Sequence, residues 1–303
     1  MIGGQRIALV TGKGGVGKST VAAALALGAA RSGRRVLVVE LAGTRRMAEL
    51  FGVRDYGYEP RPLAPNLHGM TITSEQAIED YIVQQIKVRA LYKMVFRNRV
   101  MGPFMDAVPG LHDLIQLGKV FDLEREQKGG RPAWDLILLD APATGHGITM
   151  LRTPAAMMEL TASGPFYDNA KQVHDLFADA RKTAVVLVTL AEEMPVNETL
   201  DLYSQLGSWR NQVVGCVLNE VVPPPFTDLD AWETVRAQLQ VPELEESLQL
   251  TDRAVHRARL VRHARLRLSS ALRCPLLTLP FLYHRELNPS DLVHLAAELG
   301  VSR

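Results

Sequence analysis

Short apolar runs bounded by turn residues alternate with longer segments of helical periodicity along most of this chain. The apolar runs do not alternate strictly with polar positions, which is typical of parallel strands covered by helices on both faces. The pattern therefore predicts an α/β fold with a mostly parallel, doubly wound sheet and flanking helices. The predicted strands are residues 7–10, 35–41, 136–139, 184–190, 213–218 and 276–279, with a weaker one at 68–73 and a helix at 19–32.

Two stretches interrupt this alternation and predict a helical layer. Residues 75–130 contain no convincing strand and read as two helices, interrupted around Gly102-Pro103 and Pro109-Gly110. Residues 147–181 are also mainly helical. We interpret residues 1–303 as one domain, with a helical insert at 75–130 and additional helices at 147–181.

Composition and charge indicate the compartment and the classes of partner of the protein, but not its activity. The formal net charge of +1 gives no overall field that favours nucleic acid or an anionic membrane. The N-terminus lacks the pattern of a signal peptide, and the longest apolar stretches are too short to span a bilayer. The two cysteines, Cys216 and Cys274, form no CxxC motif, which favours buried thiols in a reducing compartment. We expect a cytoplasmic protein that is not an integral membrane protein and binds no nucleic acid.

A phosphate-binding motif follows the first predicted strand. The segment from Gly12 to Thr20 fits GxxxxGK[ST], and an alanine-rich helix follows it. Its glycines allow the backbone N–H groups to point at phosphate oxygens, and the helix N-terminus adds its dipole. Lys18 is expected at the β and γ phosphates, and the Ser19 hydroxyl at Mg²⁺. We therefore expect ATP and Mg²⁺ as cofactors, held by Gly12, Gly14, Gly15, Val16, Gly17, Lys18, Ser19 and Thr20.

A second lysine, Lys13, follows the first glycine of the motif and gives the sequence GKGGVGK. This deviant form resembles the loop of the ArsA/Get3 ATPases, the MinD/ParA positioning ATPases and the nitrogenase iron protein. The resemblance implies a homodimer in which Lys13 reaches across the interface to the nucleotide of the partner. The alternative is a lysine that is merely solvated beside the loop.

Further segments resemble the ArsA/Get3-type ATPases in particular. Asp140-Ala141-Pro142-Ala143-Thr144-Gly145-His146 is similar to the second switch of that family, with the proline one position early. The resemblance implies that Asp140 binds Mg²⁺, through water; a strand-end aspartate that caps a helix is the alternative. His146 is either a phosphate sensor or a structural histidine.

The C-terminal half carries the resemblance to the nucleoside site. Asn219, at the end of a predicted strand, matches the asparagine that reads the adenine edge in the family, although a simple turn is possible there. Pro280 and Phe281 resemble the loop beside the base, with core packing of Phe281 as the alternative. The matching segments run in order from about residue 5 to residue 299, so the chain is similar to an ArsA/Get3-type ATPase over most of its length.

The first switch departs from the family pattern Asp-Pro-Ala-His. The aligned residues are Glu40-Leu41-Ala42-Gly43, and Glu40 is predicted to orient the attacking water. Its additional methylene matters, because a displacement of about 1 Å can cost roughly 100-fold in rate. A strand-end carboxylate without a catalytic role, and hence slow hydrolysis, is the alternative.

The helical insert suggests a binding partner. Residues 91–117 are rich in methionine and other apolar residues, and such surfaces accommodate varied apolar clients. The resemblance implies a groove for a hydrophobic client helix or a membrane-associated partner; the alternative is that the insert packs on itself. The arginines of 253–273 are expected to lie on a solvated helix, balanced by the acidic stretch 228–246.

These observations favour an ATP-hydrolysing homodimeric switch of the ArsA/Get3 type that couples nucleotide state to a hydrophobic client. A MinD/ParA-like positioning ATPase and a nucleotide-dependent scaffold with little turnover are the alternatives. The absence of clustered cysteines in the sequence disfavours an arsenite pump. Both cysteines also lie too late in the chain for a shared iron–sulfur cluster.

Overall fold

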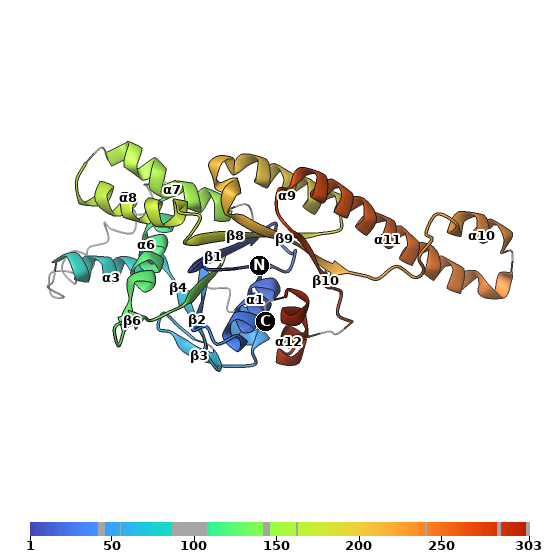
Figure 1. Ribbon diagram of the computed structural model, residues 1–303, viewed down its shortest axis with the longest axis horizontal. Coiled ribbons are helices and arrows are strands. Elements are labelled where there is room, and N and C mark those ends of the chain that lie inside the picture. Colours follow the sequence, from blue (N-terminus) through green and yellow to red (C-terminus); the bar gives the residue numbers. More distant parts are fainter. Residues whose placement is uncertain are drawn as a thin grey trace.

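A single eight-stranded sheet, in the order β10-β9-β8-β1-β7-β2-β4-β3, forms the centre of the molecule (Figure 1). The computed structural model describes residues 1–41, 46–54, 56–86, 108, 110–141, 146–161, 163–239, 241–283 and 286–300. Neighbouring strands pair in parallel, except β3 and β4, which are antiparallel. The predicted α/β fold with a mostly parallel sheet is confirmed. The strands are β1 (Ile7–Gly12), β2 (Val36–Leu41), β3 (Arg61–Ala64), β4 (Leu67–Ile72), β7 (Leu136–Asp140), β8 (Thr183–Leu190), β9 (Val213–Val221) and β10 (Leu276–Pro280).

Helices cover both faces of this sheet, which explains why the strands read as continuous apolar runs. In β1, Ala8 and Val10 belong to one apolar cluster and Ile7 and Leu9 to the other. The first cluster lies under α1 (Lys18–Arg31), α2 (Arg46–Leu50) and α12 (Pro289–Glu298). The second lies under α6 (Leu111–Arg125), α7 (His146–Thr161), α8 (Pro165–Ala178), α9 (Glu193–Gln205) and part of α11 (Glu245–Ala271).

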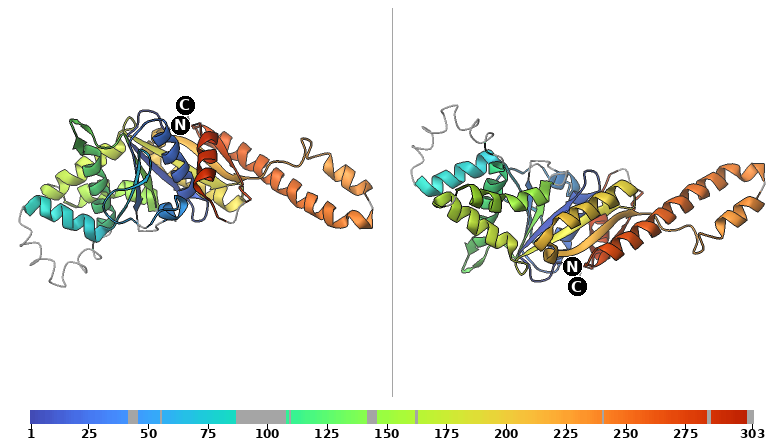
Figure 2. Two further views of the ribbon diagram at one scale, coloured as in Figure 1. Left: turned by 90° about the horizontal axis from the view of Figure 1, so that it is seen from below. Right: turned by 90° about the horizontal axis from the view of Figure 1, so that it is seen from above.

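The expected helical layer forms one end of the molecule (Figure 2). There α3 (Ser74–Ile86) packs on α6, and α6 packs on α7 and α8. Residues 87–107 and 109 lie outside the described residues, and they include most of the methionine-rich segment. Most of the segment predicted to form a client groove therefore lies outside the described residues.

Three strands, β3, β5 and β6, were absent from the sequence-based prediction. A hairpin of β5 (Gln127–Lys128) and β6 (Arg131–Pro132) closes at Gly129 and Gly130, both with positive φ. Its strands are exposed and polar, so no apolar pattern marks them. The edge strand β3 was also missed; it contains Pro62, which an edge strand tolerates because one side of its backbone needs no partner.

The described structure also contains the helix α10 (Trp232–Gln238), which precedes α11. Two short 3₁₀ turns are η1 (Gly207–Gln212), after α9, and η2 (Pro242–Leu244), between α10 and α11. In Figures 1 and 2, α10 and the first half of α11 extend away from the sheet as a hairpin, which we call the arm. Arg262 pairs with Asp230 at 2.9 Å, and Arg259 with Glu233 at 2.7 Å. These pairs agree with the predicted balance between the arginines of 253–273 and the acidic stretch.

The two cysteines lie toward one edge of the sheet. Cys216, in β9, is buried as expected, whereas Cys274 is half-buried. Burial raises the pKa of both thiols above its ordinary value. Within the described residues, none of the helices has the length and apolar character that crossing a bilayer would require.

Candidate functional site

The phosphate loop joins β1 to α1 at the centre of the sheet. From β1 the chain passes through α1 on one face to β2, whereas β7 is followed by α7 and α8 on the other face and then by β8 (Figure 1). In open α/β sheets, such a reversal creates a crevice at the carboxyl ends of the strands, where ligands bind. The loop that the motif predicted to hold phosphate therefore lies at this crevice.

Glycine is required at two positions of the loop by close approach. A Cβ on Gly12 would lie 2.2 Å from the carbonyl oxygen of Val188, in the neighbouring strand. A Cβ on Gly17 would lie 2.2 Å from Nδ2 of Asn219, and Gly17 also has a left-handed φ of 84°. Gly14 and Gly15 are exposed, and Val16 is buried beneath the loop.

Lys18 begins α1 and folds back across the loop. Its Nζ donates a hydrogen bond to the carbonyl oxygen of Lys13 at 2.8 Å, and the residue is only 7% exposed. Burial lowers the pKa of Lys18, while the negative charge of Asp140 opposes that change. The ammonium thus lies within the loop, as the motif requires of a group that contacts phosphate.

Ser19 and Asp140 meet at the predicted metal site. The hydroxyl of Ser19 donates to Oδ2 of Asp140 at 2.6 Å, which joins α1 to the end of β7. Asp140 is 5% exposed, and its Oδ1 is buried without a hydrogen-bond partner in the described part of the chain. Burial raises the pKa of Asp140 to about 6; Ser19 and Lys18 oppose the rise, and the charge of Glu40 adds to it. Hydroxyl and carboxylate oxygens are ligands that Mg²⁺ prefers, so these residues fit the ion.

Glu40 lies beside Asp140 on the adjacent strand and is fully buried. One carboxylate oxygen accepts a hydrogen bond from the backbone N–H of Met47 at 3.2 Å, and the other accepts from the hydroxyl of Tyr56. In this conformation Glu40 connects the end of β2 to α2 and to Tyr56. Its role in orienting water stays a prediction, and Ala42 and Gly43 lie outside the described residues.

Lys13 points toward α9 of the same chain. Its Nζ forms an ion pair with Glu198 and lies 2.9 Å from the sulfur of Met194. Lys13 is therefore partnered within the chain and not merely solvated, and its reach across a dimer interface stays a prediction. No local pattern could have indicated Glu198, because it follows Lys13 by 185 positions.

The residues predicted for the base gather at the ends of β9 and β10. Asn219 is buried, and its Nδ2 donates to the carbonyl oxygen of Val16 at 3.0 Å, so its amide holds the phosphate loop. Pro280 ends β10, and the backbone N–H of Phe281 donates to the carbonyl oxygen of Val221. The Phe281 ring is 37% exposed and packs edge-to-face on Tyr283 at 5.0 Å between centroids. The exposure of Phe281 agrees better with a contact to a base than with packing in the core. Tyr283 was not among the residues predicted from the sequence.

The remaining predicted switch residues follow Asp140 and lie mostly outside the described residues. Residues 142–145 lie outside the described residues, and so does the side chain of His146, the first residue of α7.

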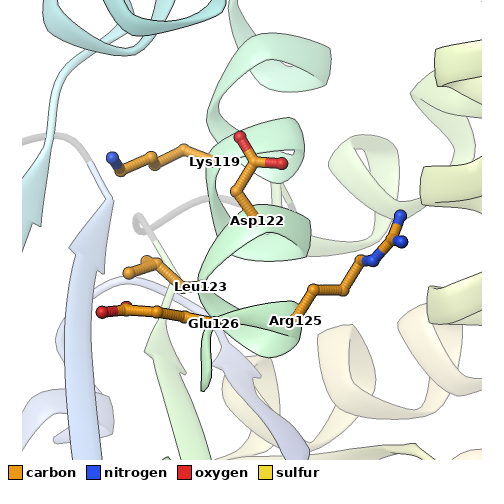
Figure 3. A pocket seen from close by; sticks show the side chains of 5 residues that line it. All are labelled: Lys119, Asp122, Leu123, Arg125 and Glu126. Atoms are coloured by element: carbon orange, nitrogen blue, oxygen red, sulfur yellow. The ribbon is translucent and has the colours of Figure 1, made fainter. Parts of the chain in front are cut away.

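A separate surface hollow of about 330 Å³ lies on α6 (Figure 3). Figure 3 shows Arg125 pointing away from Lys119 and Glu126, so these charges do not converge on a ligand.

Comparisons with known proteins agree with this arrangement. The family model described as "Anion-transporting ATPase" matches residues 5–163 and 156–262. The ATPase BagA of Mycobacterium tuberculosis strain H37Rv is 31% identical over 301 residues, covering 92% of this chain and 88% of the relative. A putative arsenical pump-driving ATPase of Halobacterium salinarum is 28% identical, covering 80% of this chain and 39% of the relative. The ATPase GET3 of Chaetomium globosum is 24% identical, covering 80% of this chain and 81% of the relative.

Proposed function

The chain belongs to the anion-transporting ATPase family, and from this premise we propose that it is a Mg²⁺-dependent, homodimeric ATP switch that binds a hydrophobic client. ATP hydrolysis follows from the family. The observation that carries the proposal is the Ser19–Asp140 hydrogen bond beside the buried Lys18, because it gathers a hydroxyl, a carboxylate and a cation at one helix N-terminus. We propose that ATP and Mg²⁺ bind there.

Each residue of this cluster has a separate task in the proposal. The ammonium of Lys18 exchanges the carbonyl of Lys13 for the β and γ phosphate oxygens. Ser19 and ionised Asp140 would hold Mg²⁺, Asp140 through water, and the ion would supply positive charge that neutralises the phosphates. The loop N–H groups and the N-terminus of α1 contribute the remaining positive potential.

The predicted dimer gives Lys13 its task. For Lys13 to reach a partner's nucleotide, its ion pair with Glu198 must open, so nucleotide-driven dimerisation competes with a contact inside the subunit. The exposed position of the pair supports this exchange, because a solvent-exposed ion pair contributes only about 0–1 kcal/mol.

The client and the location are proposed from relatives and sequence. The dimer and the hydrophobic client are proposed from the resemblance to the ArsA/Get3-type ATPases, with which a relative named ATPase GET3 agrees, and the methionine-rich segment 91–117 supplies candidate contacts. Relatives named arsenical pump-driving ATPases raise the alternative of arsenite. Full burial of Cys216 disfavours it, because trivalent arsenic requires accessible thiolates. We propose a cytoplasmic location and one nucleotide-binding domain with a helical insert.

A second candidate, a nucleotide-dependent scaffold with little turnover, is favoured by one observation. Glu40 is fully buried and accepts hydrogen bonds from Met47 and Tyr56, as an anchoring residue would. Our first proposal retains Glu40 as the residue that orients water, which requires these contacts to be exchanged during the cycle.

One experiment tests the proposal as a whole. Mg²⁺-dependent ATP hydrolysis and size-exclusion light scattering are measured for the wild type, Lys18→Ala and Lys13→Ala. We expect turnover and an ATP-dependent dimer in the wild type, no nucleotide binding in Lys18→Ala, and binding without a dimer in Lys13→Ala. ATP binding by the wild type with neither turnover nor a dimer would favour the scaffold.

A further inference from the structure

Glu220 has a backbone conformation that its residue type does not favour. Its φ is 55°, and among the described residues only Asn66 shares a positive φ without being glycine. Asn66 lies in the tight turn before β4, where asparagine tolerates this conformation. Glutamate has no such tolerance, and a left-handed backbone is unfavourable at a non-glycine residue. A residue held in this way often serves a function.

A β-bulge produces this conformation at the nucleotide crevice. Leu218 pairs with Thr278 and Val221 pairs with Pro280, so β9 takes three steps where β10 takes two. Bulges of this kind re-aim a side chain next to a functional site. Here the bulge contains Asn219, which turns to the phosphate loop, and Glu220, which remains exposed.

The Glu220 carboxylate lies close to the start of α1. Its Oε1 is 3.9 Å from the position that a Cβ on Gly17 would occupy. The strand order places β9 on the opposite side of β1 from β7, which carries Asp140. With Mg²⁺ and the γ-phosphate on the β7 side, the nucleoside leaves the loop on the β9 side, toward Glu220 and the exposed ring of Phe281.

A carboxylate at this place needs a hydrogen-bond donor from the ligand. The phosphates of ATP are anionic and would repel it. Partial desolvation raises the pKa of the Glu220 carboxyl group, and the negative charge of Glu192 adds to the rise, so a second carboxylate already lies near Glu220. Uncharged ATP donors are the two ribose hydroxyls and the amino group of the base. The ribose is attached to the α-phosphate, whereas the amino group lies at the far edge of the base.

We propose that Glu220 recognises the ribose of the bound nucleotide, with its carboxylate accepting a hydrogen bond from the 2′- or 3′-hydroxyl. Glu220 is thereby a specificity-determining residue that selects nucleotides carrying the contacted ribose hydroxyl over the deoxy analogue that lacks it. This inference rests on the nucleotide site of the proposed function, and it adds a residue and a selectivity to that site.

Calorimetric titration of the full chain tests this role without turnover. The ligands are Mg²⁺ with ADP, 2′-deoxy-ADP, 3′-deoxy-ADP and inosine diphosphate, which lacks the amino group. The variants are Glu220→Gln, which keeps the side-chain length, and Glu220→Asn, which also tolerates the left-handed backbone. Glu193→Gln is the control, because it removes an exposed carboxylate from the nearby start of α9.

We expect the wild type and Glu193→Gln to bind ADP roughly 10-fold or more tightly than at least one deoxy analogue, as for a hydrogen bond to a charged group. In both Glu220 variants this ratio should fall toward parity, while the ratio of ADP to inosine diphosphate stays as in the wild type. An unchanged deoxy ratio in the variants would overturn the inference. So would a change confined to inosine diphosphate, which would place Glu220 at the base. Absence of ADP binding by the wild type would overturn the proposed function as well.

Discussion

The ammonium of Lys13, in the phosphate loop, forms an ion pair with the carboxylate of Glu198, on α9. Both side chains are partly exposed, 32% for Lys13 and 41% for Glu198. The pair therefore holds the lysine against its own chain through a contact that water and salt weaken. In the proposed function, the nucleotide and the partner subunit both bind next to this contact.

Glu198→Gln is expected to favour the ATP-dependent dimer, because it releases Lys13 from its partner within the subunit. An exposed pair contributes at most about 1 kcal/mol, and formation of the homodimer opens two such pairs, so the dimer dissociation constant should fall by no more than about 30-fold. Sedimentation velocity with and without ATP measures it. Asp201→Asn, an exposed carboxylate on the same helix, is the control and should leave the constant unchanged. A weaker dimer in Glu198→Gln would contradict the competition and indicate that Glu198 holds the partner.

Asp140→Asn is expected to stabilise the nucleotide-free protein at pH 7.5. The folded pKa of Asp140 is raised from 3.8 to about 6, so the free energy of unfolding loses a contribution as pH rises through this window. Asparagine keeps an acceptor for Ser19 and carries no charge. The gain should be roughly 1–3 kcal/mol at pH 7.5 and should vanish below about pH 3, where the carboxyl group is protonated in both the folded and the unfolded state. Urea unfolding at several pH values measures it.

The same variant should lose the response to nucleotide. Mg²⁺ with ATP should stabilise the wild type and leave Asp140→Asn nearly unchanged, because the amide cannot provide the charge that balances the ion. Equal stabilisation of both proteins would remove Asp140 from the metal site.

Glu40→Gln and Tyr56→Phe separate two roles of Glu40. If Glu40 orients water, Glu40→Gln should lower turnover roughly 100-fold with little change in ATP affinity. Tyr56→Phe removes one hydrogen bond to the carboxylate and should cost about 1–3 kcal/mol of folding free energy with turnover retained. Steady-state hydrolysis and urea unfolding supply both quantities. Matching losses of turnover in the two variants would assign Glu40 the anchoring role.

Gly17→Ala is expected to abolish nucleotide binding and to destabilise the fold. The added methyl group meets the Asn219 amide, and the left-handed backbone costs roughly 1–3 kcal/mol for alanine. Gly118→Ala is the control, since its Cβ meets nothing within 4 Å and Gly118 lies inside α6; it should stabilise by about 0.5–1 kcal/mol. Tight ADP binding by Gly17→Ala would contradict the close packing of the loop.

The sequence predicted the features that depend on local spacing. The phosphate loop, the strand that ends at Asp140 and the buried runs of the sheet all have signatures within a few residues. The position of Glu198 beside Lys13 and of Tyr56 beside Glu40 depends on how distant segments meet, and no local pattern contains that information. Glu220 was missed for another reason, since its conformation arises from a bulge between β9 and β10.

The arm connects the region of the phosphate loop to a distant part of the molecule through α9 and α11. On α9, Asn197 precedes Glu198 and accepts a hydrogen bond from Arg267 of α11 at 2.7 Å. The 27 residues of α11 span about 40 Å, so tilting the helix by about 10° at its base would move its far end by about 7 Å. The helix that carries Glu198 also contacts the base of α11, the longest helix in the described structure. Opening or closing the Lys13–Glu198 ion pair therefore has a direct structural route to the far end of the arm.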